Sequence, residues 1–583
     1  MADKHFPRAL SIRWLRDAYL KHEVSPEDTV REIVNRAEAD AGMNIWITPP
    51  RMERIRPYLD RLASLDPAGA PLWGIPFAMK DNIDWAGVPT TAGCPDFQYV
   101  PTEHAAVVAR LIAAGAIPVG KTNMDQFATG LVGTRSPYGE THNALRGDLI
   151  SGGSSSGSAV AVARGHAAFA LGTDTAGSGR VPAALNGLVG FKPSLGAWPT
   201  KGVVHACASL DCVTVFTHDL ADALEVDRAA RGIDDFDPWS KSFLPPTAAI
   251  PAKLCLPKEQ LHFFGPYAKE YGRAWQTAVE RLNRLDIEIE YVDIRLFSQA
   301  ASLLYGGPFV EERWAGLGGF IDAHPGSALP VTEQILRSGA AEQYDAASLF
   351  KAMHTLQMLK LESGKLLKDA VLVLPTAGGT WSRDQVRANP VQTNNEMGRY
   401  TNHCNLLDLC AVAVPSDAAA IGLPFGITLF ALAENEGLLC GAAKAFLGDP
   451  GVHATAVSRP NTLVAVCGLH MRGYPLEKQM RACGARFVRE DRTAAKYRMV
   501  RLPTTPSKPG LVKRPQGGSA IGLEVWEMPM EAFGLFVASI PAPLCIGKVE
   551  LRDGTEIPGF VCEDYAAAEA EDITAFGGWR TAK

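Results

Sequence analysis

Two loops rich in glycine and serine, both inside residues 152–193, constrain this chain more than any other feature. The segment reads GGSSSGSAVAVARGHAAFALGTDTAGSGRVPAALNGLVGFKP. Small and apolar residues between the loops predict a helix and then a short strand, and Pro182 suits the first turn of a further helix. A flexible Gly/Ser linker would have a regular apolar pattern on at most one side. Because both sides have one, both loops are predicted to be held between regular elements.

Two short motifs near these loops match known patterns, but their surroundings argue against both. Residues 153–157 fit G-x-S-x-G, the nucleophile elbow of α/β-hydrolases, which needs a strand running straight into the turn. The residues before it, 143–150, are typical of a loop. Residues 115–122 fit the phosphate-binding pattern G-x-x-x-x-G-K-[ST], which follows a strand. This match follows a predicted helix, 104–114, and its own middle predicts a strand, so Gly115 is better explained as a helix C-cap.

Three motifs, in matching order and spacing, resemble the amidase signature family of Ser-Ser-Lys amide hydrolases. They are Gly74-Ile75-Pro76-Phe77-Ala78-Met79-Lys80-Asp81, Ser151-Gly152-Gly153-Ser154-Ser155 and Gly172-Thr173-Asp174-Thr175-Ala176-Gly177-Ser178-Gly179-Arg180. The resemblance covers roughly residues 20–440. It implies Ser178 as the nucleophile, Ser154 as a bridging serine that usually follows a cis peptide, and Lys80 as the base.

The same resemblance implies roles for the rest of the second loop. The N–H groups of four consecutive residues, Thr175, Ala176, Gly177 and Ser178, would hold the oxyanion, and Asp174 and Arg180 would form an ion pair that shapes the loop. The sequence departs from the commonest family form at two positions. Ala176 stands where glycine is frequent, which narrows the backbone freedom of the loop, and Ser156 replaces the first glycine of S-S-G-G.

Lys80 is unusual because it ends a strand that is otherwise apolar. Without the two serines, a solvated lysine at the edge of a sheet would be the favoured interpretation. A lysine in a dry site has a lowered pKa, because burial disfavours the charged form. A neutral amine is what a base for a serine hydroxyl needs.

Length and composition set the broad class. A chain of 583 residues predicts two domains, or three. Apolar residues make up 47% of the chain and charged residues 21%, which is ordinary for a soluble globular protein. The net charge is −6 and the sequence has no basic stripe, which argues against binding of nucleic acid. The eleven scattered cysteines, with no C-x-x-C pair, predict buried reduced thiols instead of disulfides or a zinc site. With no signal peptide and no long apolar run, we expect a soluble cytoplasmic protein that does not bind membranes.

The chain in order predicts an α/β fold, a mixed or parallel sheet wrapped by helices. Residues 1–65 predict helices, with Ser25-Pro26-Glu27-Asp28 as a helix start. A strand within 72–84, a helix at 104–114 and a strand at 116–121 follow. Two buried strands are predicted at 371–375 and 410–415.

Residues 297–319 predict a helix broken at 306–308, which could point Tyr305 and Arg313 at one site. The alternative for Arg313 is a surface ion pair with Glu311 or Glu312.

A second domain is predicted at 461–583, after a linker at about 447–461 that ends the first domain, 1–450. Its signals are strands at 463–467 and 523–526 and a hairpin at 548–561 that turns at Asp553-Gly554. The tail resembles the C-terminal domain of allophanate hydrolases, a smaller β-rich α+β fold akin to γ-glutamyl cyclotransferases. The matching pieces are Gly468-Leu469-His470-Met471-Arg472-Gly473, Lys508-Pro509-Gly510-Leu511 and Asp572-Ile573-Thr574-Ala575-Phe576-Gly577-Gly578-Trp579-Arg580.

Both resemblances together imply an allophanate hydrolase that releases ammonia and carbon dioxide without a metal or organic cofactor. They imply Tyr305, Arg313 and Gly130 as substrate-binding residues, and His470 as a candidate for a decarboxylation step in the second domain. A satisfied surface histidine is an equally good interpretation of His470 from sequence alone. We expect a homodimer that acts on a small molecule and associates with upstream pathway enzymes. Two alternatives stay open: an amidase for biuret-like or aliphatic amides, and a non-catalytic scaffold like that of an amidotransferase.

Overall fold

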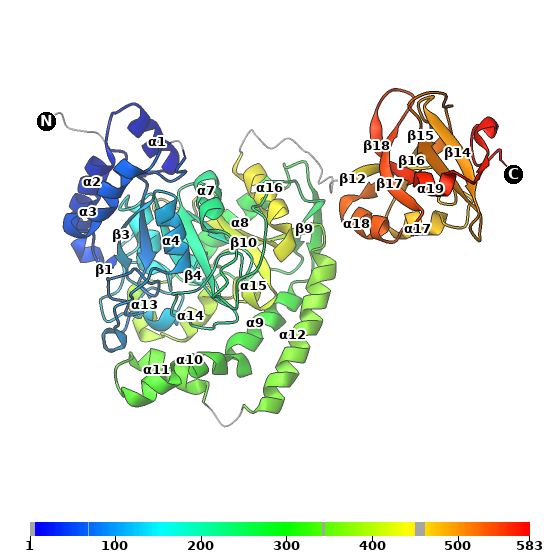
Figure 1. Ribbon diagram of the computed structural model, residues 1–583. Helices are drawn as coiled ribbons and strands as arrows, with labels where there is room; N and C mark the ends of the chain where they lie inside the picture. The colour runs from blue at the N-terminus through cyan, green and yellow to red at the C-terminus, as the bar shows by residue number, and fades with distance from the viewer. Residues whose placement is uncertain (1–5, 68, 341–343, 449–460, 583) are drawn as a thin grey trace. The chain divides into compact units, whose positions relative to one another are not determined.

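The computed structural model describes residues 6–67, 69–340, 344–448 and 461–582, and the chain divides into two compact units (Figure 1). The units are Met1–Ala456 and Val457–Lys583. The expected linker at about 447–461 lies, apart from its ends, outside the described residues.

The first unit is built on one mixed sheet of eleven strands. In spatial order these are β1 (Trp46–Thr48), β3 (Ile117–Thr122), β2 (Pro76–Lys80), β4 (Phe169–Asp174), β6 (Cys212–Thr217), β5 (Val189–Lys192), β10 (Leu409–Pro415), β11 (Gly426–Leu432), β9 (Ala370–Pro375), β7 (Lys253–Pro257) and β8 (Glu288–Val292). Its central strands are buried along their whole length, as their continuous apolar runs predict. The predicted mixed sheet is confirmed. The short edge strand β1 was not anticipated, because three half-buried residues carry too little pattern.

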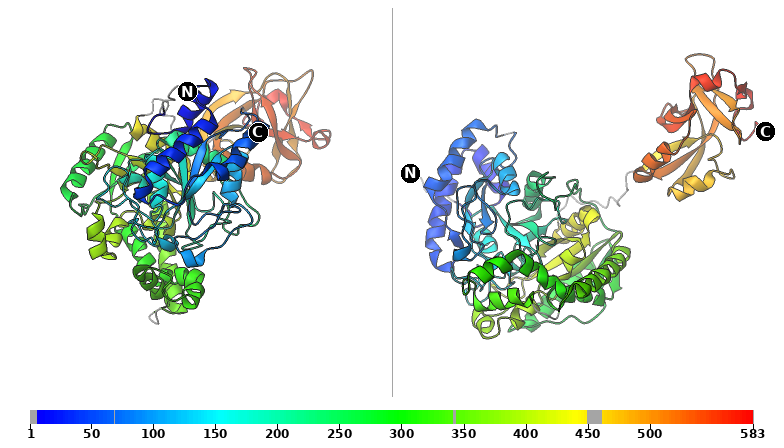
Figure 2. Two further views of the ribbon diagram at one scale, coloured as in Figure 1. Left: turned by 90° about the vertical axis from the view of Figure 1, so that its left-hand side faces the viewer. Right: turned by 60° about the horizontal axis from the view of Figure 1, so that its bottom comes forward.

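Helices surround this sheet (Figure 2). The main ones are α1 (Ile12–Leu20), α2 (Pro26–Ala39), α3 (Met52–Arg61), α4 (Ala106–Ala113), α5 (Ser156–Ala163), α6 (Val181–Leu185), α7 (Leu220–Ala230), α8 (Ala268–Leu282), α9 (Arg295–Tyr305), α10 (Glu311–Ala323), α11 (Pro330–Ser338), α12 (Ala346–Leu366), α13 (Arg383–Ala388), α14 (Gln392–Met397), α15 (His403–Leu406) and α16 (Glu436–Leu447). Ser25 and Asp28 form the capping box predicted at the start of α2. The predicted break after residue 305 is also present, between α9 and α10.

Strands β2 and β4 place the two motif-bearing ends together. They pair in parallel, with Phe77 opposite Phe169 and Met79 opposite Leu171. Because parallel strands end at the same edge of a sheet, Lys80 at the end of β2 lies beside the loop that follows Asp174 at the end of β4. The phosphate-loop match at 115–122 is strand β3 itself, and Gly115 follows the end of α4 with a φ of +95°. This confirms the prediction that it is no phosphate loop.

The second unit has its own core and two sheets. In spatial order, the strands of the larger sheet are β13 (Arg486–Arg492), β16 (Gly522–Pro529), β12 (Asn461–Val466), β18 (Glu556–Cys562) and β17 (Leu544–Glu550). Those of the smaller sheet are β15 (Lys508–Lys513), β14 (Tyr497–Leu502) and β19 (Glu571–Asp572). Short helices α17 (Glu477–Ala482), α18 (Met530–Ala538) and α19 (Asp564–Ala567) complete it. The predicted hairpin is β17–β18, and Gly554 in its turn has a φ of +86°. All eleven cysteines are free thiols, nine of them buried, as expected.

Candidate active site

Lys80 is fully buried at the end of β2 and contacts two hydroxyl groups. Its Nζ lies 2.7 Å from Ser154 Oγ and 2.8 Å from Thr173 Oγ1. The alternative of a solvated edge lysine is wrong, because the side chain has no exposed surface. Two of the three residues expected to act together, Lys80 and Ser154, are therefore in direct contact.

The surroundings of Lys80 favour its neutral form. Burial lowers the pKa of the ammonium to about 7, although the charges of Asp211, Asp125 and Asp174 oppose this. None of these carboxylates forms an ion pair with Lys80 in the described part of the chain. At a pH slightly above 7, most of the amine can accept a proton.

The two serines lie on the two loops that the sequence singles out. Ser154 follows Gly153 through a cis peptide bond and precedes α5, and it is fully buried. Ser178 precedes α6 and is 3% exposed. Across the described residues, no hydrogen bond joins Ser178 Oγ to Ser154 Oγ, so the structure brings the serines to the same edge of the sheet without linking them.

The loop between β4 and α6 is organised by a buried ion pair. Arg180 donates from Nε and Nη2 to the two carboxylate oxygens of Asp174, at 2.9 Å each. The backbone N–H groups of Gly177 and Gly179 donate to the same carboxylate at 2.9 and 3.0 Å. Burial opposes ionisation of Asp174, but the charge and hydrogen bonds of Arg180 hold its pKa below the usual value. The ion pair expected from the family resemblance thus folds the loop around one carboxylate.

These contacts narrow the set of candidate oxyanion donors. The N–H of Gly177 was expected among them, but it is already bonded to Asp174. The N–H groups of Thr175, Ala176 and Ser178 donate to no residue that the structure describes. Three of the four expected donors are therefore available to a substrate oxygen.

Close packing explains the residue types in this loop. A Cβ at Gly177, where φ is +135°, would lie 2.3 Å from Thr401 Oγ1. Ala176, the departure from the family form, is 2% exposed within an apolar cluster that includes Leu210, and its carbonyl accepts a 2.8 Å hydrogen bond from Thr401. The extra methyl group of alanine thus fills space that the loop already encloses.

The expected substrate-binding residues are placed unequally. Arg313, in α10, is 1% exposed and donates from Nη1 to Thr129 Oγ1 at 3.1 Å. The alternative places Arg313 on the surface, which is wrong because the residue is buried, and Glu312 bonds to Ser209. Gly130 adjoins Thr129, and a Cβ there would lie 2.6 Å from Asp125 Oδ2. Tyr305 ends α9, and its side chain lies outside the described part of the structure.

Three residues of this site were not singled out from the sequence: Thr173, Asp125 and Asp211. Thr173 lies inside a quoted motif, so its position next to the glycine-rich loop could have been noticed. Asp125 accepts from the backbone N–H groups of Gly133 and Arg135 at 3.0 and 2.9 Å. Asp211 accepts from the hydroxyl of Thr175 and from the N–H of Ala206. Neither aspartate belongs to a motif recognised in the sequence, and the contact of Asp211 with Thr175 joins residues 36 positions apart.

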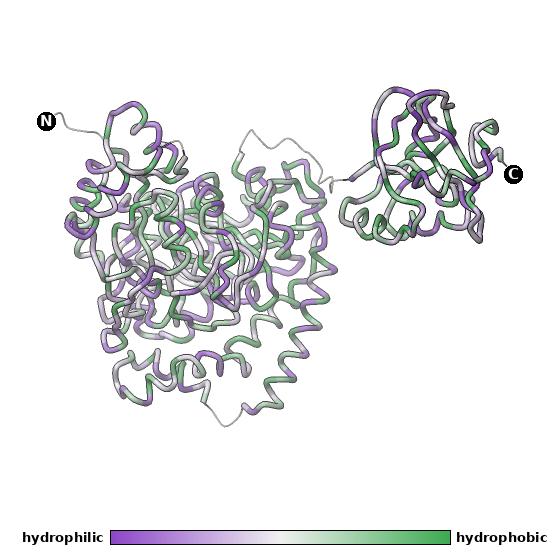
Figure 3. The backbone as a smooth tube through the Cα atoms, viewed as in Figure 1, coloured by the Kyte–Doolittle hydropathy of each residue, from purple (hydrophilic) through white to green (hydrophobic). Residues whose placement is uncertain are grey.

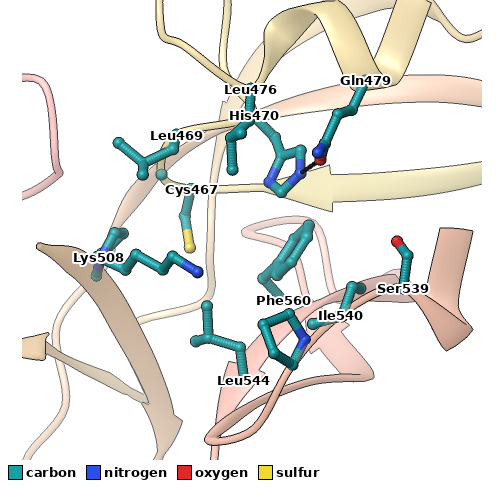
Figure 4. A pocket seen from close by; sticks show the side chains of 13 residues that line it. Cys467, Leu469, His470, Leu476, Gln479, Lys508, Ser539, Ile540, Leu544 and Phe560 are labelled. Atoms are coloured by element: carbon teal, nitrogen blue, oxygen red, sulfur yellow. Dashed lines mark hydrogen bonds between the residues drawn. The ribbon is translucent and has the colours of Figure 1, made fainter. Parts of the chain in front are cut away.

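His470 lies in the second unit, on the wall of a cavity of about 300 Å³ (Figure 4). Its Nε2 is 3.0 Å from Gln479 Oε1, and its ring stacks on Phe560 with centroids 4.7 Å apart. Burial lowers the pKa of His470, and nearby Lys508 lowers it further against the effect of Gln479. Lys508 points into the same cavity and forms no ion pair with any residue between 461 and 582. The cavity thus combines a lysine that forms no ion pair within residues 461–582 with a histidine whose pKa is lowered by burial.

The fold, with a buried lysine on a serine hydroxyl beside a glycine-rich loop, is that of a class of amide-hydrolysing enzymes. The Amidase family model matches residues 28–440, and the model for the allophanate hydrolase C-terminal domain matches residues 462–583. The chain belongs to the amidase family and carries the allophanate hydrolase C-terminal domain.

Several relatives resemble the chain over both units. The urea amidolyase of Saccharomyces cerevisiae is 38% identical over 575 residues, 92% of this chain and 31% of the relative. The solved allophanate hydrolase of Kluyveromyces lactis is 37% identical, with a TM-score of 0.73 and 98% of each chain covered.

A more distant relative shares the fold of the first unit alone. It is a solved glutamyl-tRNA(Gln) amidotransferase chain from Thermotoga maritima, 24% identical with a TM-score of 0.63 over 77% of this chain and 96% of that one. The chain spans about a third of the length of the curated urea amidolyases it matches. No helix in the described ranges is long and apolar enough to cross a membrane.

Proposed function

We propose that this chain hydrolyses allophanate, the carboxylated form of urea, to ammonia and carbon dioxide. The observation that carries the proposal is the similarity to the Kluyveromyces lactis allophanate hydrolase over 98% of both chains, which includes the second unit. An amidase for other small amides would need only the first unit. We assign the amide hydrolysis to residues 1–450 and a second step to residues 461–583.

In the first step, Ser178 attacks the amide carbonyl. Neutral Lys80 takes a proton from Ser154, at a distance of 2.7 Å, and Ser154 takes one from Ser178. The N–H groups of Thr175, Ala176 and Ser178 hold the negative charge of the tetrahedral intermediate. One such donor typically lowers the barrier by about 3 kcal/mol. The relay returns the proton to the leaving nitrogen, ammonia departs, and water hydrolyses the acyl-enzyme to N-carboxycarbamate.

Recognition of allophanate requires a cation for its carboxylate. We assign this role to Arg313, with Tyr305 and the backbone at Gly130 completing the subsite. A buried guanidinium can bind a planar carboxylate through two parallel hydrogen bonds, which lysine cannot do. The contact of Arg313 with Thr129 supports the assignment, because it fixes the guanidinium next to Gly130.

The test compares Arg313→Ala with the wild type on allophanate, malonamide, biuret and urea, with ammonia release as the readout. We expect Arg313→Ala to lose about 2–5 kcal/mol of transition-state binding for allophanate, the usual cost of breaking a desolvated charge pair. Neutral malonamide should lose far less. Ser178→Ala supplies the inactive background. Equal losses on allophanate and malonamide would contradict the carboxylate role of Arg313, and faster turnover of another amide by the wild type would overturn the substrate.

In the second step, we propose that the cavity around His470 accelerates loss of carbon dioxide from N-carboxycarbamate. This product is an anion with a carboxylate at each end of an N–H group. The ammonium of Lys508 suits one carboxylate, and His470 can exchange a proton with the nitrogen that decarboxylation leaves behind. The carbamate that remains then decomposes to ammonia and a second carbon dioxide.

We further propose that the protein works in the cytoplasm as a homodimer and obtains allophanate from an upstream enzyme of urea or s-triazine nitrogen use. The urea amidolyases join a region similar to this chain to further sequence, which favours association with such an enzyme.

A further inference from the structure

Asp211 is a buried carboxylate beside the candidate active site that takes no part in the proposed proton relay. Hydrophobic and near-neutral residues predominate in the middle of the first unit, where the sheet lies (Figure 3). A charged side chain in such surroundings is costly unless it is hydrogen-bonded or paired. Asp211 meets this requirement with hydrogen bonds to both carboxylate oxygens. One of these bonds leads to the loop that carries Ser178.

The register of two buried strands brings Asp211 and Thr175 together. Strands β4 and β6 pair antiparallel, and Asp174, the last residue of β4, lies opposite Cys212, the first residue of β6. One residue further on, the same register places Thr175 opposite Asp211. Oδ1 of Asp211 accepts a hydrogen bond from the hydroxyl of Thr175.

The other oxygen of Asp211, Oδ2, is held by the residues that precede β6. It accepts from the backbone N–H groups of Ala206 and Cys207 at 2.7 and 3.3 Å, and it lies 3.3 Å from Nδ1 of His205. Burial disfavours protonation of His205, but the hydrogen bond and charge of Asp211 raise its pKa above the usual value. Thr175 thus meets a carboxylate that two backbone donors and an imidazole already fix in place.

A second contact joins the same two segments. Asn405 Nδ2 donates to the carbonyl of Asp174 at 2.7 Å and to that of Leu210 at 2.8 Å. Leu210 also packs in the apolar cluster that contains Ala176. The first half of the loop, up to Ala176, is therefore held against residues 205–211, whereas the second half folds around the Asp174 carboxylate.

We propose that Asp211 is a positioning residue of this site: by holding Thr175, it directs the N–H groups of Thr175 and Ala176 toward the substrate oxygen. The inference rests on the oxyanion role proposed above for these N–H groups and names the residue on which their direction depends. Such donors are effective because they already point to the place where negative charge develops, so no reorganisation is needed during the reaction.

The charge of Asp211 provides a separate readout of its place at the site. Burial lowers the pKa of Lys80, and among the carboxylates that oppose this effect Asp211 comes before Asp125 and Asp174. Asp211→Asn keeps an oxygen for Thr175 but removes the charge that favours the ammonium. The pKa of Lys80 should then fall further, and the acid limb of kcat/KM should move to lower pH. Thr175→Val keeps the charge and should leave the limb in place.

The deciding test is Thr175→Val, which keeps the shape of the side chain and removes the hydroxyl that Asp211 holds. The assay uses whichever of allophanate, malonamide, biuret and urea the wild type hydrolyses fastest, so a different substrate leaves the test intact. We expect kcat to fall at least about tenfold while KM stays within about twofold, because the oxyanion forms only in the transition state. Thr175→Ser, which restores the hydroxyl, should recover most of kcat.

Thr29→Val is the matched control, because it removes another buried hydroxyl, one that accepts from Tyr19 at 3.1 Å. It should lower stability and keep the wild-type kcat. A wild-type kcat in Thr175→Val beside an inactive Ser178→Ala would overturn this inference and leave the proposed function standing. A Thr175→Ser enzyme as slow as Thr175→Val would also overturn it, as would an unmoved acid limb in a folded Asp211→Asn. Activity in Ser178→Ala would overturn the proposed function instead. If Asp211→Asn does not fold, the Thr175 variants still decide.

Discussion

Lys80 lies in direct contact with one hydroxyl of the proposed relay and has a pKa of about 7 because it is buried. A base must be unprotonated to act, so lowering the pH through this pKa removes the active form. We expect kcat/KM for ammonia release to be level above pH 8 and to fall about tenfold per pH unit well below pH 7. Lys80→Arg should be nearly inactive at every pH, because guanidinium does not lose its proton.

The control for this prediction is Lys201→Arg, which alters a half-exposed lysine paired with Glu103. It should keep the wild-type profile. Near-normal turnover by Lys80→Arg, or a profile without an acid limb near pH 7, would show that Lys80 is only structural.

Thr173 is the second hydroxyl in contact with Lys80, and it accepts one N–H of the amine at 2.8 Å. We expect this contact to orient the neutral amine so that its lone pair can face Ser154. Thr173→Val keeps the shape and removes the acceptor. A hydrogen bond to the charged amine is typically worth about 1.5–3 kcal/mol, so its loss disfavours the charged form and should move the acid limb of the pH profile to lower pH. We also expect kcat to fall by about tenfold.

Thr173→Ser, which restores a hydroxyl, should recover most of the activity and the position of the limb. A structural role alone would lower the stability of Thr173→Val without moving its pH profile.

Among the elements, the loop between β4 and α6 depends on one buried ion pair. Arg180→Met leaves the Asp174 carboxylate buried without its counter-charge, which typically costs about 3–5 kcal/mol of unfolding free energy. Asp174→Asn combined with Arg180→Met removes both charges and should recover much of that stability. Activity should stay low in the double variant, because an amide oxygen holds the N–H groups of Gly177 and Gly179 more weakly than a carboxylate does.

Denaturant unfolding measures the stability of the wild type and the two variants, and ammonia release measures their activity. A double variant that regains activity together with stability would contradict the role of Asp174 in shaping the loop.

The same elements show how far the sequence could predict this site. Lys80 at a strand end, Ser154 and Ser178 were found because each belongs to a contiguous motif. The orientation of the Gly177 N–H toward Asp174 was missed, because a motif gives residue types and does not give the direction of a backbone group. The contacts of Thr401 with the loop, and those of Asp211 with Thr175, join segments far apart in the chain, so no local pattern contains them.

At the scale of the whole molecule, each unit has its own buried core. The first is built around the eleven-stranded sheet, and the second around residues such as Val464, Val525 and Trp526. In the second unit, β12, β16 and the hairpin β17–β18 were predicted from apolar runs and a clear turn, whereas β13, β14, β15 and β19 were not predicted. The cavity at His470 was not, because Gln479, Lys508 and Phe560 come from separate elements. Two units with separate candidate sites allow a variant in one to be tested without disturbing the other.

His470→Ala tests whether the second unit takes part in the chemistry. Because Ser178 and Lys80 belong to the first unit, we expect the first ammonia to be released at the wild-type rate. Carbon dioxide should follow with a lag, since a positioned general acid or base typically contributes roughly 10²–10⁴-fold and only the spontaneous reaction would remain. Stopped-flow detection of both products from allophanate measures the lag.

Lys508→Met should show the same lag, whereas Tyr565→Ala, an exposed change in the same unit, should show none. If His470→Ala releases both products at the wild-type rates, the second unit does not accelerate decarboxylation and the enzyme's chemistry ends at Ser178.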